Sequence, residues 1–121
     1  MTINEFMLNL IGENWSEKEW IEEQDLINKE YQIDRKNAAR ILHMYLLNEL
    51  SIKDVKDITP AYVIKDLFDC RVCANHIAQI YLRGLMEPIK IGEICMFDLH
   101  GDVNDEEIKN IKCKLSAIIN T

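Results

Sequence analysis

The sequence predicts a small all-α domain of about five to six helices, arranged as two helix-loop-helix repeats. Three observations support this prediction. Apolar residues recur with helical spacing, capping residues precede several of these stretches, and the pattern occurs twice, at about residues 15–50 and 66–115. The 121 residues suffice for one domain, 1–121, with a modest core. Short apolar runs near residues 89–97 predict a β-ribbon between helices.

The first helix is expected over residues 3–11, where apolar side chains form one stripe, and Gly12 is a suitable stop. Ser16 and Glu19 have the spacing of a capping box, so a second helix is expected to begin there.

Two tryptophans flank that predicted helix start. Trp15 and Trp20 stand at the two positions of a hydrophobic staple, which explains them without any ligand. Their rings could alternatively serve as stacking platforms for sugars, and both interpretations stay open.

The central helix follows Asp34, a capping residue, and carries a wide apolar stripe up to Leu50. His43 lies away from the centre of this stripe and is expected at the surface or its boundary. Pro60 suits the first position of a short helix, where no backbone N–H is needed.

The second repeat begins with a helix over residues 70–83, capped by Asp69 and ended by Gly84. Asn104 and Glu107 form another predicted capping box, and this box opens the last helix.

The chain is acidic, with a formal net charge of −7 and a pI near 4.9. Direct nucleic-acid binding is not expected, because it needs a basic face that displaces counterions from phosphates. The same charge disfavours a helix-turn-helix regulator built on residues 34–50. An acidic protein could instead dock on a basic partner surface, as an inhibitor that mimics nucleic acid does.

No apolar run reaches the roughly 20 residues of a membrane span, and the first residues do not resemble a signal peptide. We therefore expect a cytoplasmic protein with no membrane association, and a cell-surface location only for a fragment of a larger exported protein. In a reducing compartment the cysteines are expected to be free, mostly buried thiols. They are Cys70, Cys73, Cys95 and Cys113.

Cys70, Cys73 and His76 form a C-x-x-C-x-x-H pattern, which suggests a small zinc-binding protein as a lesser alternative. Helical geometry argues against it, because at about 100° per residue Cys70 and His76 point about 120° apart. We expect no metal and no other cofactor.

The sequence contains no glycine-rich phosphate loop, no G-x-S-x-G motif and no H-E-x-x-H motif. Its acidic residues occur at the predicted helix starts and on the predicted solvent-facing sides of the helices. We therefore predict that the protein is not an enzyme.

Four segments resemble the S-layer homology repeat of bacterial surface proteins, and the resemblance covers about residues 15–115. The family opens the second helix of a repeat with Ile-Thr-Arg-Ala-Glu, and residues 33–39 (IDRKNAA) and 103–107 (VNDEE) stand in that place. Residues 80–86 (IYLRGLM) look like the ending of a first helix, and residues 97–100 (FDLH) resemble the loop that follows it.

The resemblance implies a non-catalytic binding or assembly module with its site between repeats. In the family, the arginine at the helix start helps to hold an anionic, pyruvate-modified wall polysaccharide. Arg35 keeps this position, whereas Asp105 replaces the arginine in the second repeat. Arg35 and Trp20 are thus the candidate glycan-binding residues, and the expected partner is a protein or an anionic cell-wall polysaccharide.

Overall fold

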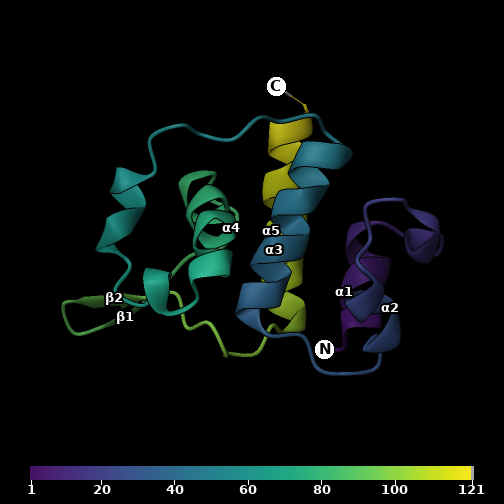
Figure 1. Cartoon of the computed structure of the whole chain (residues 1–121), viewed down its shortest axis with the longest axis horizontal. Coiled ribbons are helices and arrows are strands. Elements are labelled where there is room, and N and C mark those ends of the chain that lie inside the picture. Colours follow the sequence, from purple (N-terminus) through teal and green to yellow (C-terminus); the bar gives the residue numbers. More distant parts are fainter. Residues whose placement is uncertain (121) are drawn as a thin grey trace.

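The computed structural model describes residues 1–120 and is mostly helical, with one small antiparallel sheet (Figure 1). Within these residues there are five α-helices, three short 3-10 helices and two strands. The α-helices are α1 (Ile3–Leu10), α2 (Glu23–Ile27), α3 (Arg35–Asn48), α4 (Arg71–Leu82) and α5 (Asp105–Ile119). The 3-10 helices are η1 (Trp15–Glu17), η2 (Thr59–Val63) and η3 (Leu67–Asp69), and the strands are β1 (Ile89–Ile91) and β2 (Ile94–Met96). The predicted helical fold and the predicted ribbon are both confirmed.

Helices α1, α3 and α5 begin at the same end of the molecule, close to the N-terminus (Figure 1). The segments that precede them are joined through their backbones. The N–H of Ile33 donates to the carbonyl of Met1 at 2.9 Å, and the N-terminal amine of Met1 donates to the carbonyl of Val103 at 3.3 Å. Isolated antiparallel bridges pair residue 2 with 32 and residue 34 with 102. We call this meeting point of the three segments the hub.

Each of the three helices carries a side-chain cap at the hub. Thr2, Asp34 and Asn104 each accept a hydrogen bond from the backbone N–H three residues on, at 2.9 to 3.0 Å. These bonds satisfy N–H groups that would otherwise lack a partner in the first turn. The cap predicted at Asp34 is therefore confirmed. Of the capping box predicted at Asn104, only the bond from the Glu107 N–H forms, because the Glu107 carboxylate pairs with Arg35. The cap at Thr2 was not recognised in the sequence.

Helix α4 packs along α3, and buried side chains from the helices and from the segments between them form one hydrophobic cluster. Its largest fully buried members include Phe6, Ile41, Leu42, Ile77 and Phe97. Gly84 ends α4 with φ of +71°, a conformation that favours glycine, as the sequence predicted. No helix among residues 1–120 combines the length and the apolar character needed to cross a membrane.

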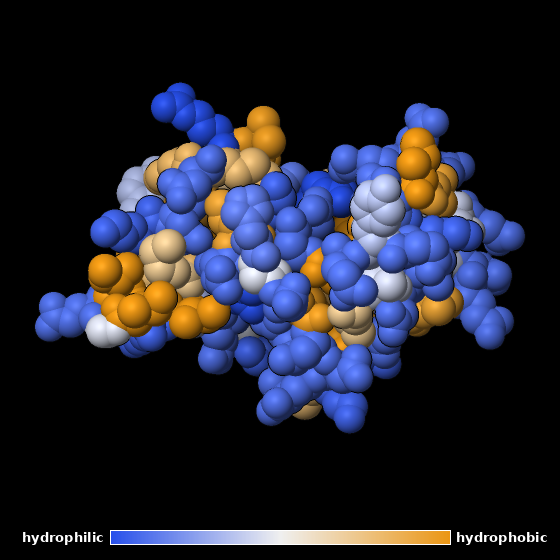
Figure 2. All heavy atoms as spheres, turned by 90° about the horizontal axis from the view of Figure 1, so that it is seen from below, coloured by the Kyte–Doolittle hydropathy of each residue, from blue (hydrophilic) through white to orange (hydrophobic). Residues whose placement is uncertain are grey.

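The β-hairpin projects from one end of the molecule and pairs residue 89 with 96 and residue 91 with 94. The N–H of Lys65 donates to the carbonyl of Cys95 at 2.8 Å, which ties the hairpin to the segment between η2 and η3. Apolar side chains remain exposed at this end of the molecule, where orange atoms gather in Figure 2. They are Tyr62, Val63, Phe68, Ile89, Ile91 and Ile94, and we call them the hairpin surface.

The helix predicted to begin at Ser16 is wrong. The chain makes only the turn η1 there and forms the short helix α2 farther on, without a side-chain cap. The two tryptophans explain the difference. Trp15 Nε1 donates to Asn4 Oδ1 at 3.0 Å, and Trp20 Nε1 donates to Glu49 Oε1 at 2.8 Å, so distant partners fix this segment.

The cap predicted at Asp69 is also wrong, because Asp69 belongs to η3 and Cys70 is the N-cap of α4. The side chain of Cys70 makes no capping hydrogen bond to the first turn of α4. This unusual start places both cysteines of the C-x-x-C pattern at the beginning of the helix.

Candidate functional site

A groove of about 520 Å³ lies beside the hub, between the start of α3 and the first turns of α5. Its ionisable lining residues are Arg35, Glu87, Asp98, Asp102, Glu106, Glu107 and Lys114. We call it the α3–α5 groove. It places residues of both sequence repeats side by side, although residues 35 and 107 are far apart in the chain.

Arg35 lies at the base of the groove, and its side chain is only 6% exposed. Nε donates to the carbonyl of Phe97 at 2.8 Å and Nη2 to the carbonyl of Glu87 at 2.7 Å, while Nη1 pairs with the carboxylate of Glu107. The guanidinium also lies over the Phe97 ring, 4.8 Å from its centroid. Arg35 therefore joins α3, α5 and the segments on both sides of the hairpin.

This geometry accounts for an arginine just inside a helix start, where the helix dipole disfavours a cation. The backbone N–H groups of Arg35 and Lys36 donate to the carbonyls of Gly101 and Leu99, both at 3.0 Å. The whole start of α3 is thus bound to the loop that leads into α5.

Asp66 shapes the neighbouring part of the groove, although no sequence pattern singled it out. It is 4% exposed, and its carboxylate accepts hydrogen bonds from the N–H of Phe97 at 2.7 Å and of Asp98 at 2.9 Å. Asp98 itself has φ of +65°, which positions its side chain at the groove beside Gly101. The buried carboxylate of Asp66 therefore fixes the backbone turn at residues 97–98 by binding two consecutive N–H groups.

The α3–α5 groove is acidic. Its lining has five carboxylates and two cations, which leaves a formal charge of −3. One of the cations, Arg35, is already paired with Glu107, and Lys114 lies 3.6 Å from Glu87. This distribution attracts cationic groups and repels anionic ones.

Trp20, the other predicted glycan residue, does not lie with Arg35. Its indole contacts Tyr45 edge to face, with the ring centroids 6.4 Å apart, and hydrogen-bonds Glu49 at the C-terminal end of α3. Arg35 begins the same helix, so the two sites are separated by about 20 Å at 1.5 Å per residue. The structure does not bring these two residues into one site.

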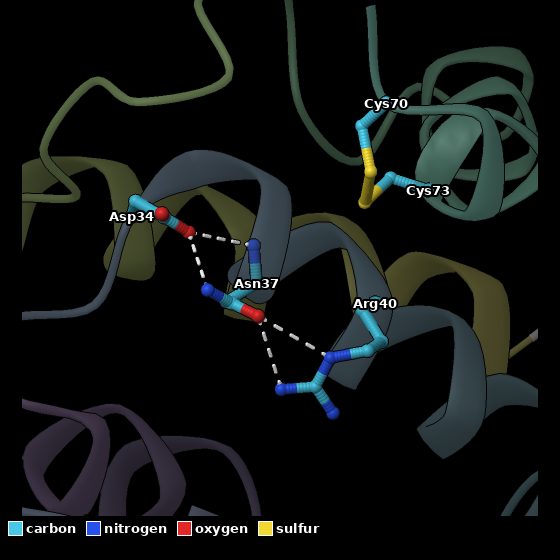
Figure 3. The surroundings of a disulfide bond; sticks show 5 residues. All are labelled: Asp34, Asn37, Arg40, Cys70 and Cys73. Carbon is cyan, nitrogen blue, oxygen red and sulfur yellow. Dashed lines mark hydrogen bonds between the residues drawn. A yellow bond between two sulfur atoms is a disulfide. The ribbon is translucent and has the colours of Figure 1, made fainter. Parts of the chain in front are cut away.

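Cys70 and Cys73 form a disulfide, which corrects the prediction that both are free thiols. Figure 3 shows the bond at the start of α4, opposite the part of α3 that carries Asn37 and Arg40. The guanidinium of Arg40 extends away from the sulfur atoms and pairs with the buried Asp25 at 2.7 and 3.0 Å. Cysteines 95 and 113 are free.

The disulfide also bears on the lesser alternative of a zinc site at Cys70, Cys73 and His76, because bonded sulfur atoms cannot act as thiolate ligands. Within residues 1–120, no group of three His, Cys, Asp or Glu side chains is placed to hold a metal ion.

His76 instead belongs to a hydrogen-bonded chain with His43 and Asp54. The Nδ1 atoms of the two histidines are 2.8 Å apart, and His43 Nε2 is 2.6 Å from Asp54 Oδ1. His43 is 4% exposed, so its predicted surface position is wrong. Burial is the largest cause that lowers the pKa of His76 below its ordinary value, and the neighbouring His43 and Arg40 add to it.

Asp54 binds Asn75 as well as His43. Partial burial raises the pKa of Asp54, but the hydrogen bonds from His43 and Asn75 outweigh it, so that the net shift is downward. These hydrogen bonds thus link α3, α4 and the irregular segment after α3. His43, Asp54 and His76 are too far apart in the sequence for any spacing rule to reveal their hydrogen-bonded chain.

Comparison of the chain with protein-family models, with curated proteins and with solved structures finds no match.

Proposed function

We propose that this chain is a non-catalytic binding module with S-layer homology-like architecture, and that it binds its ligand in the α3–α5 groove. The observation that carries the proposal is the position of this groove. It lies between the helix starts of the two sequence repeats, at Arg35 and Asn104, which is where the resemblance places a site.

The hub adds support for repeat architecture. Thr2 and Glu5 form a reciprocal capping box at the start of α1, with both hydrogen bonds at 3.0 Å. The Thr-x-x-Glu spacing is the one that the family motif uses at the start of its second helix. Together with Asp34 and Asn104, Thr2 makes a third similar helix start at the same point.

We propose a basic segment of a protein partner as the ligand. The formal charge of −3 on the lining favours lysine and arginine side chains. Two of the carboxylates, on Asp102 and Glu106, belong to exposed residues and can form ion pairs without costly desolvation. The hairpin surface also suits a protein partner, because contiguous exposed apolar residues are typical of protein contacts.

An anionic wall polysaccharide is the alternative ligand, because Arg35 keeps the family position and lines the groove. Two arguments weigh against it. The guanidinium of Arg35 already has an acceptor for each of its three nitrogens, and Trp20 lies at the far end of α3.

The test measures binding of a fluorescently labelled oligolysine peptide to the full chain by anisotropy, at low and at high salt. We expect binding at low salt that weakens steeply as salt rises, because exposed charges are screened. The double variant Asp102→Asn, Glu106→Gln should bind about five- to tenfold more weakly.

The matched control is Glu13→Gln, Glu17→Gln, which removes the same charge from exposed residues outside the groove. Equal weakening in both variants would mean that only net charge matters and would contradict a site in the groove. A parallel sedimentation with purified cell-wall sacculi tests the alternative. Retention of the unmodified chain on the walls, with no peptide binding, would favour the polysaccharide.

A further inference from the structure

The disulfide Cys70–Cys73 has no part in the proposed groove. It closes a loop with only two intervening residues, and both of its cysteines already lie in one turn at the start of α4. Because the stabilisation from a cross-link grows with the length of the loop it closes, this bond adds little to the stability of the fold. Nor does the disulfide hold two separate elements together, because both cysteines belong to the start of α4.

We propose that Cys70 and Cys73 form a thiol-disulfide exchange site, and that its substrates are low-molecular-weight thiols and their disulfides. The site consists of a C-x-x-C pair whose first cysteine is the N-cap of a 12-residue helix. It goes beyond the binding function proposed above and does not depend on it.

The start of α4 stabilises a thiolate at Cys70. The Cys70 side chain makes no capping hydrogen bond, and the N–H of Cys73 donates to the carbonyl of Cys70 at 3.1 Å. A Cys70 thiolate formed on reduction would therefore act as the cap by accepting from the N–H of Val72, at the second position of the helix. The positive end of the helix dipole acts in the same direction. The first turn contains no acidic residue and includes Arg71, while the exposed Asp69 just before it opposes the effect.

The two cysteines lie at the boundary of the hydrophobic core. Cys70 and Cys73 are both half-buried, and the residues between them, Arg71 and Val72, are exposed, Val72 by 85%. Both cysteines also pack against the hydrophobic core, and Figure 3 shows the bond on the side of α4 that faces α3. Because the two residues between the cysteines are exposed, a small thiol would approach the bond from their side.

The reaction conserves electrons and atoms. The thiolate of an external thiol attacks Cys70 Sγ, the bond between the two sulfur atoms breaks, and Cys73 leaves with the electron pair and takes up a proton. A second external thiolate then attacks the external sulfur of the mixed disulfide and releases Cys70 as a thiolate. Two thiols become one disulfide, and the protein disulfide becomes a dithiol. The reverse sequence oxidises the pair.

The experiment equilibrates the full chain, as the Cys95→Ser, Cys113→Ser variant, in buffers of varied ratio of reduced to oxidised glutathione. Acid quenching, alkylation of free thiols and intact mass spectrometry then count the thiols. We expect one transition from zero to two alkylated thiols as reduced glutathione increases. Peptide mapping of the unmodified chain gives the same measurement if the variant folds poorly.

Either of two results would overturn the proposal. Two alkylated thiols at every glutathione ratio would show that the bond does not form. A bond that resists excess reduced glutathione until the chain is denatured would show a structural disulfide that is closed to exchange.

A second measurement compares reactivities within the reduced chain. Iodoacetamide should modify Cys70 about tenfold faster at neutral pH than the exposed Cys113, because the positive end of the helix dipole favours the reactive thiolate at Cys70. In the Cys73→Ser variant, oxidised glutathione should leave one glutathione on Cys70. Equal rates at Cys70 and Cys113 would contradict activation by the helix.

Discussion

His43 and His76 face each other across α3 and α4 with their Nδ1 atoms 2.8 Å apart, and this contact limits the number of protons that the pair can carry. One Nδ1 must be the donor and the other the acceptor. If both rings were charged, two N–H groups would point at each other. The pair therefore takes up only one extra proton while the contact is intact.

This limit predicts that acidification destabilises the protein. The pKa of His76 is lowered in the folded chain, so the unfolded chain binds a proton more readily below the ordinary histidine pKa of 6.5. The free energy of unfolding should fall as pH decreases through about 6.5, by at most about 1.4 kcal/mol per pH unit for one proton. Partial solvent exposure of His76 keeps the effect below that limit. Urea titrations at several pH values measure it.

The variant His76→Gln should reduce the fall in the free energy of unfolding between neutrality and the onset of carboxylate protonation, because the group with the lowered pKa is removed. His100→Gln is the matched control, since His100 is exposed and should leave the pH dependence unchanged. A variant at position 76 that retains the full pH dependence would exclude His76 as its source. Asp54, whose pKa is lowered, contributes only at lower pH, where its stabilisation is lost as pH falls below about 3.8.

Local sequence rules predicted the parts of the fold that depend on a few adjacent residues. The caps at Asp34 and Asn104 and the stop at Gly84 each involve a residue and the backbone within one turn, so spacing alone reveals them. The capping pattern at Ser16 failed because Trp15 and Trp20 bind side chains elsewhere in the chain.

The candidate site was less predictable than the helix ends, because its contacts join residues that are distant in the sequence. Arg35 was identified from its position, but its three acceptors come from residues more than fifty positions away, and they make it part of the base of the groove. Asp66 and Asp54 have no distinguishing spacing at all. The C-x-x-C pattern located the pair of cysteines, whereas their oxidation state follows from geometry and not from composition.

Asp66 should be essential for the turn that borders the α3–α5 groove. Asp66→Ala removes the acceptor of two N–H groups, one of them on the buried Phe97, and we expect a loss of about 3 kcal/mol in the free energy of unfolding. Asp69→Ala, a few residues on and exposed, is the control and should change stability by less than about 0.5 kcal/mol. Denaturant unfolding compares the two, and equal losses would contradict this role.

A side chain at position 101 would meet the carboxylate of Asp98. A Cβ there would overlap Asp98 Oδ2 and lie 3.0 Å from Arg35 Cδ. We expect Gly101→Ala to cost about 1 kcal/mol, measured by denaturant unfolding, because the Asp98 carboxylate must rotate away and the Arg35 side chain must shift slightly. The double variant with Asp98→Ala should cost less than the sum of the single variants, since it removes the closest clash. Simple additivity would contradict the steric explanation.

Arg35 should not be replaceable by lysine, although lysine keeps the charge. Its guanidinium reaches three separate acceptors, on Phe97, Glu87 and Glu107, from a position with almost no solvent contact. One ammonium group cannot reach all three, so Arg35→Lys leaves at least one buried acceptor without a donor. We expect it to lower the free energy of unfolding by about 2 to 3 kcal/mol.

The control for this exchange is Arg83→Lys. Arg83 is exposed and donates to one carbonyl, that of Lys53, at 2.7 Å, so the substitution should cost less than about 0.5 kcal/mol. Thermal and urea unfolding of both variants measure the difference. A loss at Arg35 no greater than at Arg83 would mean that the buried guanidinium does not hold the groove together. It would also free Arg35 for a ligand, which is the condition that binding of an anionic polysaccharide requires.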